Sequence, residues 1–389
     1  MAEGKSALES SPLYKPKAGS GATRKRMTMR NLAKHLLCRT LVYLRFDDLF
    51  RFLNRQKLLV VMYHGVTETD YRPPIWTQLP VSSFRQQLDY LRSRYTFVTL
   101  SDLLAGIRGE RNLPERAALL TFDDGLKNNF TVAFPILQKY SIPAAIFLTA
   151  DYIGTDRFLW VDELYGLLRD ALEEEKNLHV VRELAGEVLA SARALDRLYR
   201  HIVEKMKRME AEERDRWLVR LGYGALRGRK RFTEDFGFLS WEDVKTMEAS
   251  GLVEFGVHTA NHTILSHLAD CELEKEVGGA KHRIEEMLNR NMTAFCYPNG
   301  IPNLDFLAEH RDYLKSYGFQ CAFSTLSGLH SVKKSDHFVI KRVPVGSDIT
   351  SDLHYFRLNA AGVVDVARRF LLSKGTCQEN GSSGRIWLR

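Results

Sequence analysis

The sequence has few of the features that mark secreted, membrane-spanning or zinc-knuckle proteins. Its five cysteines, at positions 38, 271, 296, 321 and 377, are scattered and form no C-x-x-C pair, so neither a disulfide framework nor a zinc knuckle is expected and a reducing compartment fits best. The sequence contains no uninterrupted apolar run of about 18 residues, so no transmembrane helix is predicted. The polar first residues do not resemble a signal peptide. We therefore expect a cytoplasmic protein, or one held peripherally at the inner face of the cytoplasmic membrane.

Most of the chain also has almost no net charge. The 389 residues carry a formal charge of +8, which at first suggests a nucleic-acid partner. Residues 1–57, however, hold 13 Lys and Arg against 4 Asp and Glu, a balance of +9, and the remainder holds 43 against 44. The basic character is thus confined to a leader, and no nucleic-acid partner is expected.

The basic leader has two parts. Residues 1–26 are rich in Ser, Gly, Ala and Lys, a composition that predicts a disordered tail. Residues 31–54 show a helical pattern of leucines among Arg and Lys. A basic, leucine-rich helix can lie on an anionic membrane surface, which gives peripheral membrane contact through residues 24–55 as one interpretation. Asp47 and Asp48 interrupt the apolar stripe, so a helix packed on the domain is an equal alternative.

From residue 58 onward, apolar strands alternate with amphipathic helices. Strands are predicted at residues 58–63, 97–100, 117–121, 144–149, 252–257, 294–297, 320–324 and 339–345. Short connections between alternating elements predict parallel strands and right-handed crossovers, and seven or eight strands suffice for a closed or nearly closed β/α barrel. The expected domains are a leader over 1–57, a barrel over 58–358 with a helical insertion at about 160–231, and a C-terminal helix with a loose tail over 359–389.

Polar clusters follow three of the predicted strands. His64 follows the first strand, Asp123 and Asp124 follow another, and His258 and His262 follow a third. In a β/α barrel the C-terminal ends of the strands meet at one rim, where active sites are built. The i, i+4 spacing of the two later histidines would place both imidazoles on one side of a helical turn. Two histidines and a carboxylate are a common ligand set for a catalytic Zn²⁺ or similar divalent ion.

The adjacent carboxylates Asp123 and Asp124 predict chemistry of their own. Two such groups at the tip of a buried strand are costly without a compensating cation. If one binds a metal, the other can accept a proton from the water that attacks a carbonyl group. An Asp-Asp-Gly sequence alone is most often a turn, and an isolated His-x-x-x-His is most often surface helix. Their joint occurrence at the ends of apolar strands in one domain favours a site.

Three segments resemble the motifs of a known family. Residues 121–125 (TFDDG) and 258–262 (HTANH) are similar to the first two motifs of the polysaccharide deacetylases, the NodB-homology or carbohydrate esterase 4 group, and residues 295–300 (FCYPNG) resemble the third. The resemblance covers about residues 58–357, interrupted by the insertion. It implies an irregular (β/α)7 barrel that removes an N-acyl group, usually acetyl, from an amino sugar. It also implies that Asp123 is the general base and that the metal ligands are Asp124, His258 and His262.

The chain departs from the family pattern at two positions. Many members carry, in the third motif, an Arg that orients the base, whereas this chain has Cys296; Arg342 is the candidate replacement, and a surface ion pair is its alternative. The Leu-x-His motif that supplies a proton donor is absent. By resemblance to the deacetylases of exported poly-N-acetylglucosamine, His64 is the candidate acid, and a structural histidine is the alternative. The family also uses the loop near Asn299 to supply a backbone N–H as oxyanion donor.

The expected function is therefore a metal-dependent hydrolase that removes an N-acyl group from an amino sugar in a polysaccharide, oligosaccharide or glycolipid precursor. Zn²⁺ is the expected metal, with Co²⁺, Ni²⁺ or Mn²⁺ as alternatives. Two other functions stay open: a deformylase or deacetylase of a lipid-linked sugar at the membrane, and a catalytically silent carbohydrate-binding barrel. Trp160, Asp162 and Trp241 border the insertion and are further candidates to line a sugar cleft, although an aromatic residue there is more often part of a core.

Overall fold

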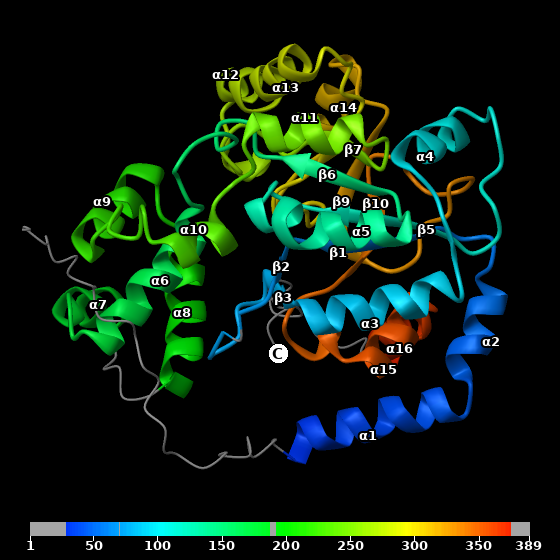
Figure 1. Ribbon diagram of the computed structural model, residues 1–389, viewed down its shortest axis with the longest axis horizontal. Coiled ribbons are helices and arrows are strands. Elements are labelled where there is room, and N and C mark those ends of the chain that lie inside the picture. Colours follow the sequence, from blue (N-terminus) through cyan, green and yellow to red (C-terminus); the bar gives the residue numbers. More distant parts are fainter. Residues whose placement is uncertain (1–28, 70, 187–191, 375–389) are drawn as a thin grey trace, which may run out of the picture.

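Seven parallel strands form a closed barrel at the centre of the molecule (Figure 1). In the computed structural model, residues 29–69, 71–186 and 192–374 are described, so the tails expected over 1–26 and from Gly375 lie outside the described residues. The barrel strands are β1 (Leu59–Tyr63), β5 (Ala117–Phe122), β6 (Ala144–Leu148), β7 (Val253–Val257), β8 (Ala294–Cys296), β9 (Cys321–Ser327) and β10 (Ile340–Pro344).

The barrel closes through its first strand. The order around it is β1-β10-β9-β8-β7-β6-β5, and β1 pairs in parallel with both β10 and β5. The short β4 (Thr96–Phe97) adds to β5, while β2 (Gly65–Thr67) and β3 (Gln78–Pro80) form a separate parallel pair. Strands that are covered on both faces have continuous apolar sequences. In agreement with this rule, every residue of β1, β5 and β6 is buried. The expected irregular (β/α)7 barrel is confirmed.

Helices cover the outside of the barrel. They are α3 (Val81–Arg92), α4 (Leu100–Ile107), α5 (Phe134–Tyr140), α11 (Trp241–Ala249), α12 (Asp270–Leu273), α13 (Ala280–Leu288) and α14 (Ala308–Ser316). Short π-helical segments, η1 (Asn129–Ala133) and η3 (Glu274–Gly279), precede α5 and α13, and single 3₁₀ turns lie at η2 (Leu265–His267) and η4 (Ile349–Ser351). These π-helical segments give a wider helical turn immediately before α5 and before α13.

Five helices of the described residues lie between β6 and α11 in the sequence, and they gather beside the barrel (Figure 1). They are α6 (Trp160–Glu173), α7 (Leu178–Ala185), α8 (Ala192–Met206), α9 (Ala211–Leu221) and α10 (Lys230–Phe236). These helices enclose an apolar cluster of their own, which includes Leu168, Val181 and Ile202. An insertion is expected over residues 160–231; the helices observed there begin at Trp160, and the last of them ends at Phe236.

The leader and the C-terminal segment pack against each other. Two helices, α1 (Met29–Tyr43) and α2 (Phe46–Leu53), replace the single helix expected over 31–54, because Arg45 adopts a left-handed φ of 60°. The C-terminal helix expected within residues 359–389 is α16 (Val363–Lys374). A further helix that the sequence did not predict, α15 (Leu353–Ala360), precedes it, and Gly362, with a φ of 88°, separates the two. Among the helices described, none combines the length and apolarity needed to cross a bilayer.

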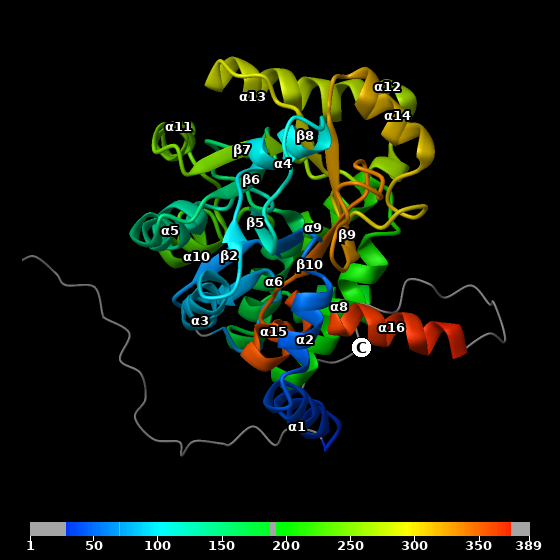
Figure 2. The same ribbon diagram turned by 90° about the vertical axis from the view of Figure 1, so that its right-hand side faces the viewer.

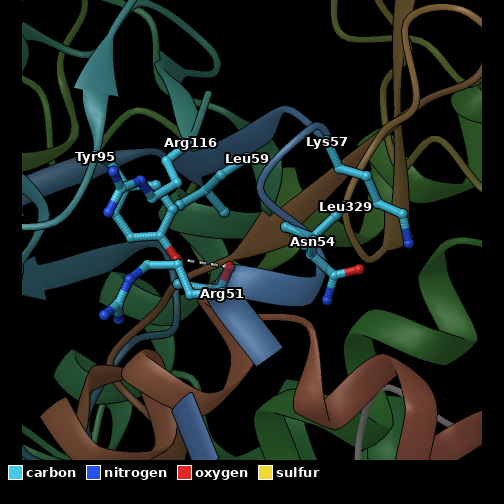
Figure 3. A pocket seen from close by; sticks show the side chains of 8 residues that line it. Arg51, Asn54, Lys57, Leu59, Tyr95, Arg116 and Leu329 are labelled. Atoms are coloured by element: carbon cyan, nitrogen blue, oxygen red, sulfur yellow. Dashed lines mark hydrogen bonds between the residues drawn. The ribbon is translucent and has the colours of Figure 1, made fainter. Parts of the chain in front are cut away.

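A small hollow lies at the N-terminal end of the strands (Figure 3). It is lined by Arg51, Asn54, Lys57, Leu59, Tyr95, Arg116, Leu329 and Ala360. Leu59 begins β1 and Arg116 precedes β5, so this hollow is at the opposite end of the barrel from the polar strand ends. It has no acidic or histidine side chain in its lining and does not match the expected chemistry.

Candidate active site and metal centre

A tight turn at the end of β5 separates the two adjacent carboxylates. Asp123 and Asp124 are 3% and 2% exposed, and the Asp123 N–H donates to the carbonyl oxygen of Tyr63 at 3.0 Å. Asp124 and Gly125 both have left-handed φ values, 74° and 84°. A Cβ on Gly125 would lie 2.9 Å from Leu148 Cδ2, so glycine is required both by the backbone and by the close approach. The turn lets neighbouring carboxylates meet different partners.

The two histidines after β7 lie in a turn and not on a helix. Thr259 and His262 have left-handed φ values of 62° and 58°, which an α-helical turn does not contain. The expectation of a helical turn is therefore wrong. The imidazoles nevertheless converge: the Nε2 atoms of His258 and His262 each lie 3.4 Å from Asp124 Oδ1.

A buried glutamate that sequence reasoning missed holds this turn. Glu276, on η3, accepts hydrogen bonds at its carboxylate from the Asn261 backbone N–H and from Asn261 Nδ2, both at 3.0 Å. Its carbonyl oxygen accepts the Ala260 N–H at 2.9 Å. An acidic residue 14 positions after the second histidine has no recognisable pattern, so only the packing of η3 on the turn shows this role.

The cluster of Asp124, His258 and His262 fits a metal ion. Asp124 Oδ1 is buried and has no hydrogen-bond partner, as expected of an atom that serves a cation. The His258 Nδ1 lies 2.8 Å from the carbonyl oxygen of Cys296; because that oxygen can only accept, Nδ1 carries the proton and Nε2 presents its lone pair to the cluster. Donors about 2.0–2.2 Å from a tetrahedral ion lie about 3.3–3.5 Å apart, which matches both 3.4 Å separations.

Arg342 engages the other carboxylate. Its Nη1 and Nη2 donate to Asp123 Oδ1 and Oδ2 at 2.7 and 2.9 Å, and its Nε donates to the carbonyl oxygen of Ser324 at 2.9 Å. The guanidinium is fully buried, so Arg342 is not part of a surface ion pair. Its Nη2 also lies 3.2 Å from Cys296 Sγ, where the small side chain leaves room for it. Asp123, His258 and Cys296 also lie close enough together to be considered as a metal-ligand set. Arg342, however, contacts both Asp123 and Cys296 at the positions where a metal ion would bind.

The pKa values of the carboxylates follow from these partners. Burial alone would raise the pKa of Asp123, but Arg342, His258 and His64 outweigh it and the pKa lies below its usual value. Burial is likewise outweighed at Asp124, whose pKa is lowered by its close contact with His258 and by the charges of His64 and His262. Both carboxylates are therefore ionised at neutral pH.

The two imidazoles differ in pKa. Burial lowers the pKa of His262 to about 4, although Asp124 acts in the opposite direction. At His258, burial would lower the pKa, but Cys296, Asp124 and Asp123 raise it well above its usual value. The carboxylates thus favour a positive charge at the point where the ligand atoms converge, and a metal ion or a proton can supply it.

His64 and Asn299 lie at the same rim. The His64 ring packs edge-on against Trp76 with centroids 5.2 Å apart, and its Nδ1 is buried without a hydrogen-bond partner. His64 is close enough to lower the pKa values of both Asp123 and Asp124. Asn299 has a left-handed φ of 58°, and no acceptor among the described residues takes its backbone N–H.

The insertion brings a further carboxyl to the site. Asp162, in the first turn of α6, is 2% exposed. Within the described parts of the chain its side chain makes no hydrogen bond or ion pair. Burial, with a contribution from the charge of Asp124, raises the pKa of Asp162 well above its usual value. Trp160 packs instead against the apolar cluster of the insertion.

The chain is similar to known bacterial deacetylases. It is 25% identical over 131 residues to the putative polysaccharide deacetylase YxkH of Bacillus subtilis, across 33% of this chain and 45% of that protein. It is 32% identical over 98 residues to the poly-beta-1,6-N-acetyl-D-glucosamine N-deacetylase of Escherichia coli K12, across 25% of this chain and 14% of that protein. The chain therefore spans less than half the length of these curated relatives.

Solved structures and a family model extend the comparison. IcaB from Ammonifex degensii is 21% identical with a TM-score of 0.49, over 78% of this chain and 97% of that one. The putative polysaccharide deacetylase BA0330 from Bacillus anthracis is 19% identical with a TM-score of 0.49, over 78% and 69%. The model of the polysaccharide deacetylase family matches residues 110–322, more than half of the 389 residues. The chain belongs to the polysaccharide deacetylase family.

Proposed function

We propose that the protein is a metal-dependent deacetylase of an N-acetylated amino-sugar glycan. The observation that supports it most strongly is that the two adjacent carboxylates at the end of β5 have different partners. Asp123 is held by both guanidinium nitrogens of Arg342, and the adjacent Asp124 lies beside the two imidazoles. A base and a three-ligand set at one rim are the components that hydrolysis of an amide requires.

Asp124, His258 and His262 would hold the divalent ion. Nitrogen and oxygen donors in a three-ligand set suit Zn²⁺, with Co²⁺, Ni²⁺ or Mn²⁺ as alternatives. When bound, such an ion supplies Lewis-acid chemistry, which polarises the acyl carbonyl and makes nearby water more acidic.

Asp123 acts as the general base. Its lowered pKa keeps it as a carboxylate at neutral pH, and each oxygen bonded to Arg342 keeps a second lone pair for a water molecule. The proton passes from the attacking water to Asp123 while Arg342 fixes the carboxylate plane. Arg342 is therefore a positioning residue in this proposal.

Two groups complete the proposed reaction. The free backbone N–H of Asn299 donates to the oxygen of the acyl group as negative charge develops on it. His64, on the same rim, donates a proton to the departing amine of the sugar. The burial of His64 Nδ1 leaves Nε2 as the nitrogen from which this proton is delivered.

The proposed substrate is a neutral polymer of N-acetylglucosamine. Relatives from Escherichia coli and Staphylococcus epidermidis are poly-beta-1,6-N-acetyl-D-glucosamine N-deacetylases, 32% and 33% identical over 98 and 76 residues. Residues 58–389 are nearly neutral, with 43 Lys and Arg against 44 Asp and Glu, which suits an uncharged glycan. The buried carboxyl of Asp162 is suited to bond a sugar hydroxyl or amide group.

Acetate release tests this proposal. Purified protein is incubated with β-1,6-linked N-acetylglucosamine oligomers, and free acetate is measured beside the variant Asp123→Asn. We expect acetate from the wild type and about 1,000-fold less from the variant, because the proton acceptor is lost. Binding of metal and oligomer with no acetate release would replace the proposal with a carbohydrate-binding barrel.

A lipid-linked amino sugar is the second candidate substrate. It is favoured by the gathering of apolar side chains on α1 and α2. The same assay with lipid-linked against free oligomers distinguishes the two, since a preference for the lipid-linked form would identify it as the substrate.

A further inference from the structure

Helix α2 turns its apolar side to solvent and its charged side to the protein. Leu49, Phe52 and Leu53 are 53%, 60% and 62% exposed. Asp47 is fully buried, and Arg51 is only 8% exposed. A surface helix of a protein in water normally buries its apolar stripe, so α2 is reversed relative to that rule.

Polar contacts with other helices fix this reversed orientation. Arg357 of α15 donates from Nε and Nη2 to Asp47 Oδ2 at 2.9 and 2.8 Å. Arg51 donates to the Tyr90 hydroxyl at 3.2 Å and pairs with Asp48. Rotation of α2 to bury its leucines would break the Asp47–Arg357 ion pair and the hydrogen bond from Arg51 to Tyr90. The buried carboxylate of Asp47 would then lack a partner, which is strongly unfavourable.

Helix α1 continues the exposed apolar surface. One side of α1 packs through Cys38 and Val42 against Leu358 of α15. Its other sides expose large apolar side chains, which together with those of α2 form the α1–α2 apolar face: Leu32, Leu36, Leu37, Tyr43, Leu44, Phe46, Leu49, Phe52 and Leu53. These are nine of the fifteen large apolar side chains that the described residues expose. Both views show α1 at the lower edge of the molecule, and Figure 1 shows α2 rising from it along the right-hand edge (Figures 1 and 2).

The charge around this face is positive. Lys34, Arg39 and Lys57 are exposed and make no ion pair within the described residues. Asp47 is buried, and Asp48 lies between Arg45 and Arg51. The face therefore presents apolar side chains with a cationic border to whatever covers it.

We infer that the α1–α2 apolar face docks on the surface of an anionic lipid bilayer. Bilayers supply both the acyl region that accepts leucine and phenylalanine and the phosphates that attract lysine and arginine. A symmetric contact with a second copy would place the same cations opposite one another. Residues 1–28 hold 6 Lys and Arg against 2 Asp and Glu, so they add positive charge and would not neutralise the border. The inference is independent of the proposed deacetylase activity.

Vesicle co-sedimentation tests the inference. The full chain is mixed with vesicles of phosphatidylcholine, alone or with phosphatidylglycerol. We expect binding to the mixed vesicles that weakens with added salt. Leu49→Glu/Phe52→Glu should reduce binding about tenfold or more, since two apolar side chains that would enter the bilayer become charged. The matched control Val219→Glu changes a side chain that is 67% exposed on α9 and should bind as wild type does.

Two further measurements keep the test decisive. Phe52→Trp should show a blue shift of tryptophan emission with mixed vesicles, and thermal unfolding of each variant checks that it is folded. Failure of the folded wild type to bind mixed vesicles would overturn the inference, as would equal binding by the double variant. A molar mass in solution that falls from dimer to monomer in Leu49→Glu/Phe52→Glu would also overturn it, because the face would then join two copies.

Discussion

Asp123 and Asp124 are chemically identical neighbours whose side chains meet different partners. The first meets a guanidinium and the second meets two imidazoles. A carboxylate in a bidentate pair with Arg is fixed in plane and ionised, which suits a base. A carboxylate with an unpartnered buried oxygen suits a metal ligand. The environment therefore divides two equal residues into two roles.

The first prediction concerns Arg342. Arg342→Met removes the charge that lowers the pKa of Asp123, so burial then raises that pKa. Because the base must be deprotonated, the acid limb of the kcat/KM profile should move to higher pH, and activity at neutral pH should fall about 100-fold as the carboxylate loses its orientation. The pH profile of acetate release is the measurement.

Arg342→Lys provides the matched comparison. Lysine keeps a positive charge but not the two-nitrogen contact, so the acid limb should stay closer to that of the wild type while kcat falls. An acid limb that does not move in Arg342→Met would contradict the assigned role of Arg342. Unfolding is measured in parallel, since loss of one partner of a buried pair costs about 3–5 kcal/mol.

At the scale of elements, the turn after β7 depends on η3. The second prediction is that Glu276→Gln weakens metal affinity about tenfold, because the group that fixes the histidine turn loses its charge and one acceptor oxygen. Glu286→Gln, at an exposed position of α13, is the control and should bind metal as wild type does. Titration of metal-free protein measures both, and equal affinity of the two variants would show that η3 does not support the site.

The insertion carries a carboxyl at a cost in stability. Because the pKa of Asp162 is raised in the folded chain, its favourable contribution is present below the unfolded pKa and is lost as pH rises through the folded pKa. The third prediction is that metal-free Asp162→Asn gains unfolding free energy over wild type as pH rises from acidic to alkaline. Denaturant unfolding at several pH values measures it.

Asp156→Asn is the control for this experiment. Asp156 is exposed near the start of the insertion, so its replacement should leave the pH dependence of unfolding unchanged. A gain in Asp162→Asn that is the same at every pH would contradict a raised pKa in the folded state. Retention of such a residue beside the cluster is expected where function, and not stability, determines the choice.

At the scale of the whole molecule, the sequence predicts features set by local patterns better than features set by long-range packing. Continuous apolar runs predicted the barrel strands because both faces of each are covered. The ends of those strands showed where Asp123, His64 and His258 would meet. The contact between Arg342 and Asp123 needs the strand order, since β1 lies between β10 and β5. The sequence predicted a closed or nearly closed barrel and offered Arg342 as a candidate, but it did not indicate which strands meet where the barrel closes.

The incorrect expectations have a common cause. The i, i+4 spacing of His258 and His262 is helical only if the intervening backbone is helical, and Thr259 is left-handed. The breaks at Arg45 and Gly362 are likewise single-residue changes of φ that an apolar periodicity does not report. Glu276 and Asp162 are recognisable only when η3 and α6 are placed against the barrel.

Metal content tests the central claim most directly. Wild type, Asp123→Asn and Asp124→Asn are purified, loaded with Zn²⁺, freed of excess metal and analysed by elemental mass spectrometry. We predict one bound ion per chain in wild type and in Asp123→Asn, and none in Asp124→Asn. The reason is that Asp123 pairs with Arg342, whereas Asp124 lies beside the two imidazoles. Retention of the ion by Asp124→Asn, or its loss from Asp123→Asn, would contradict this division of roles.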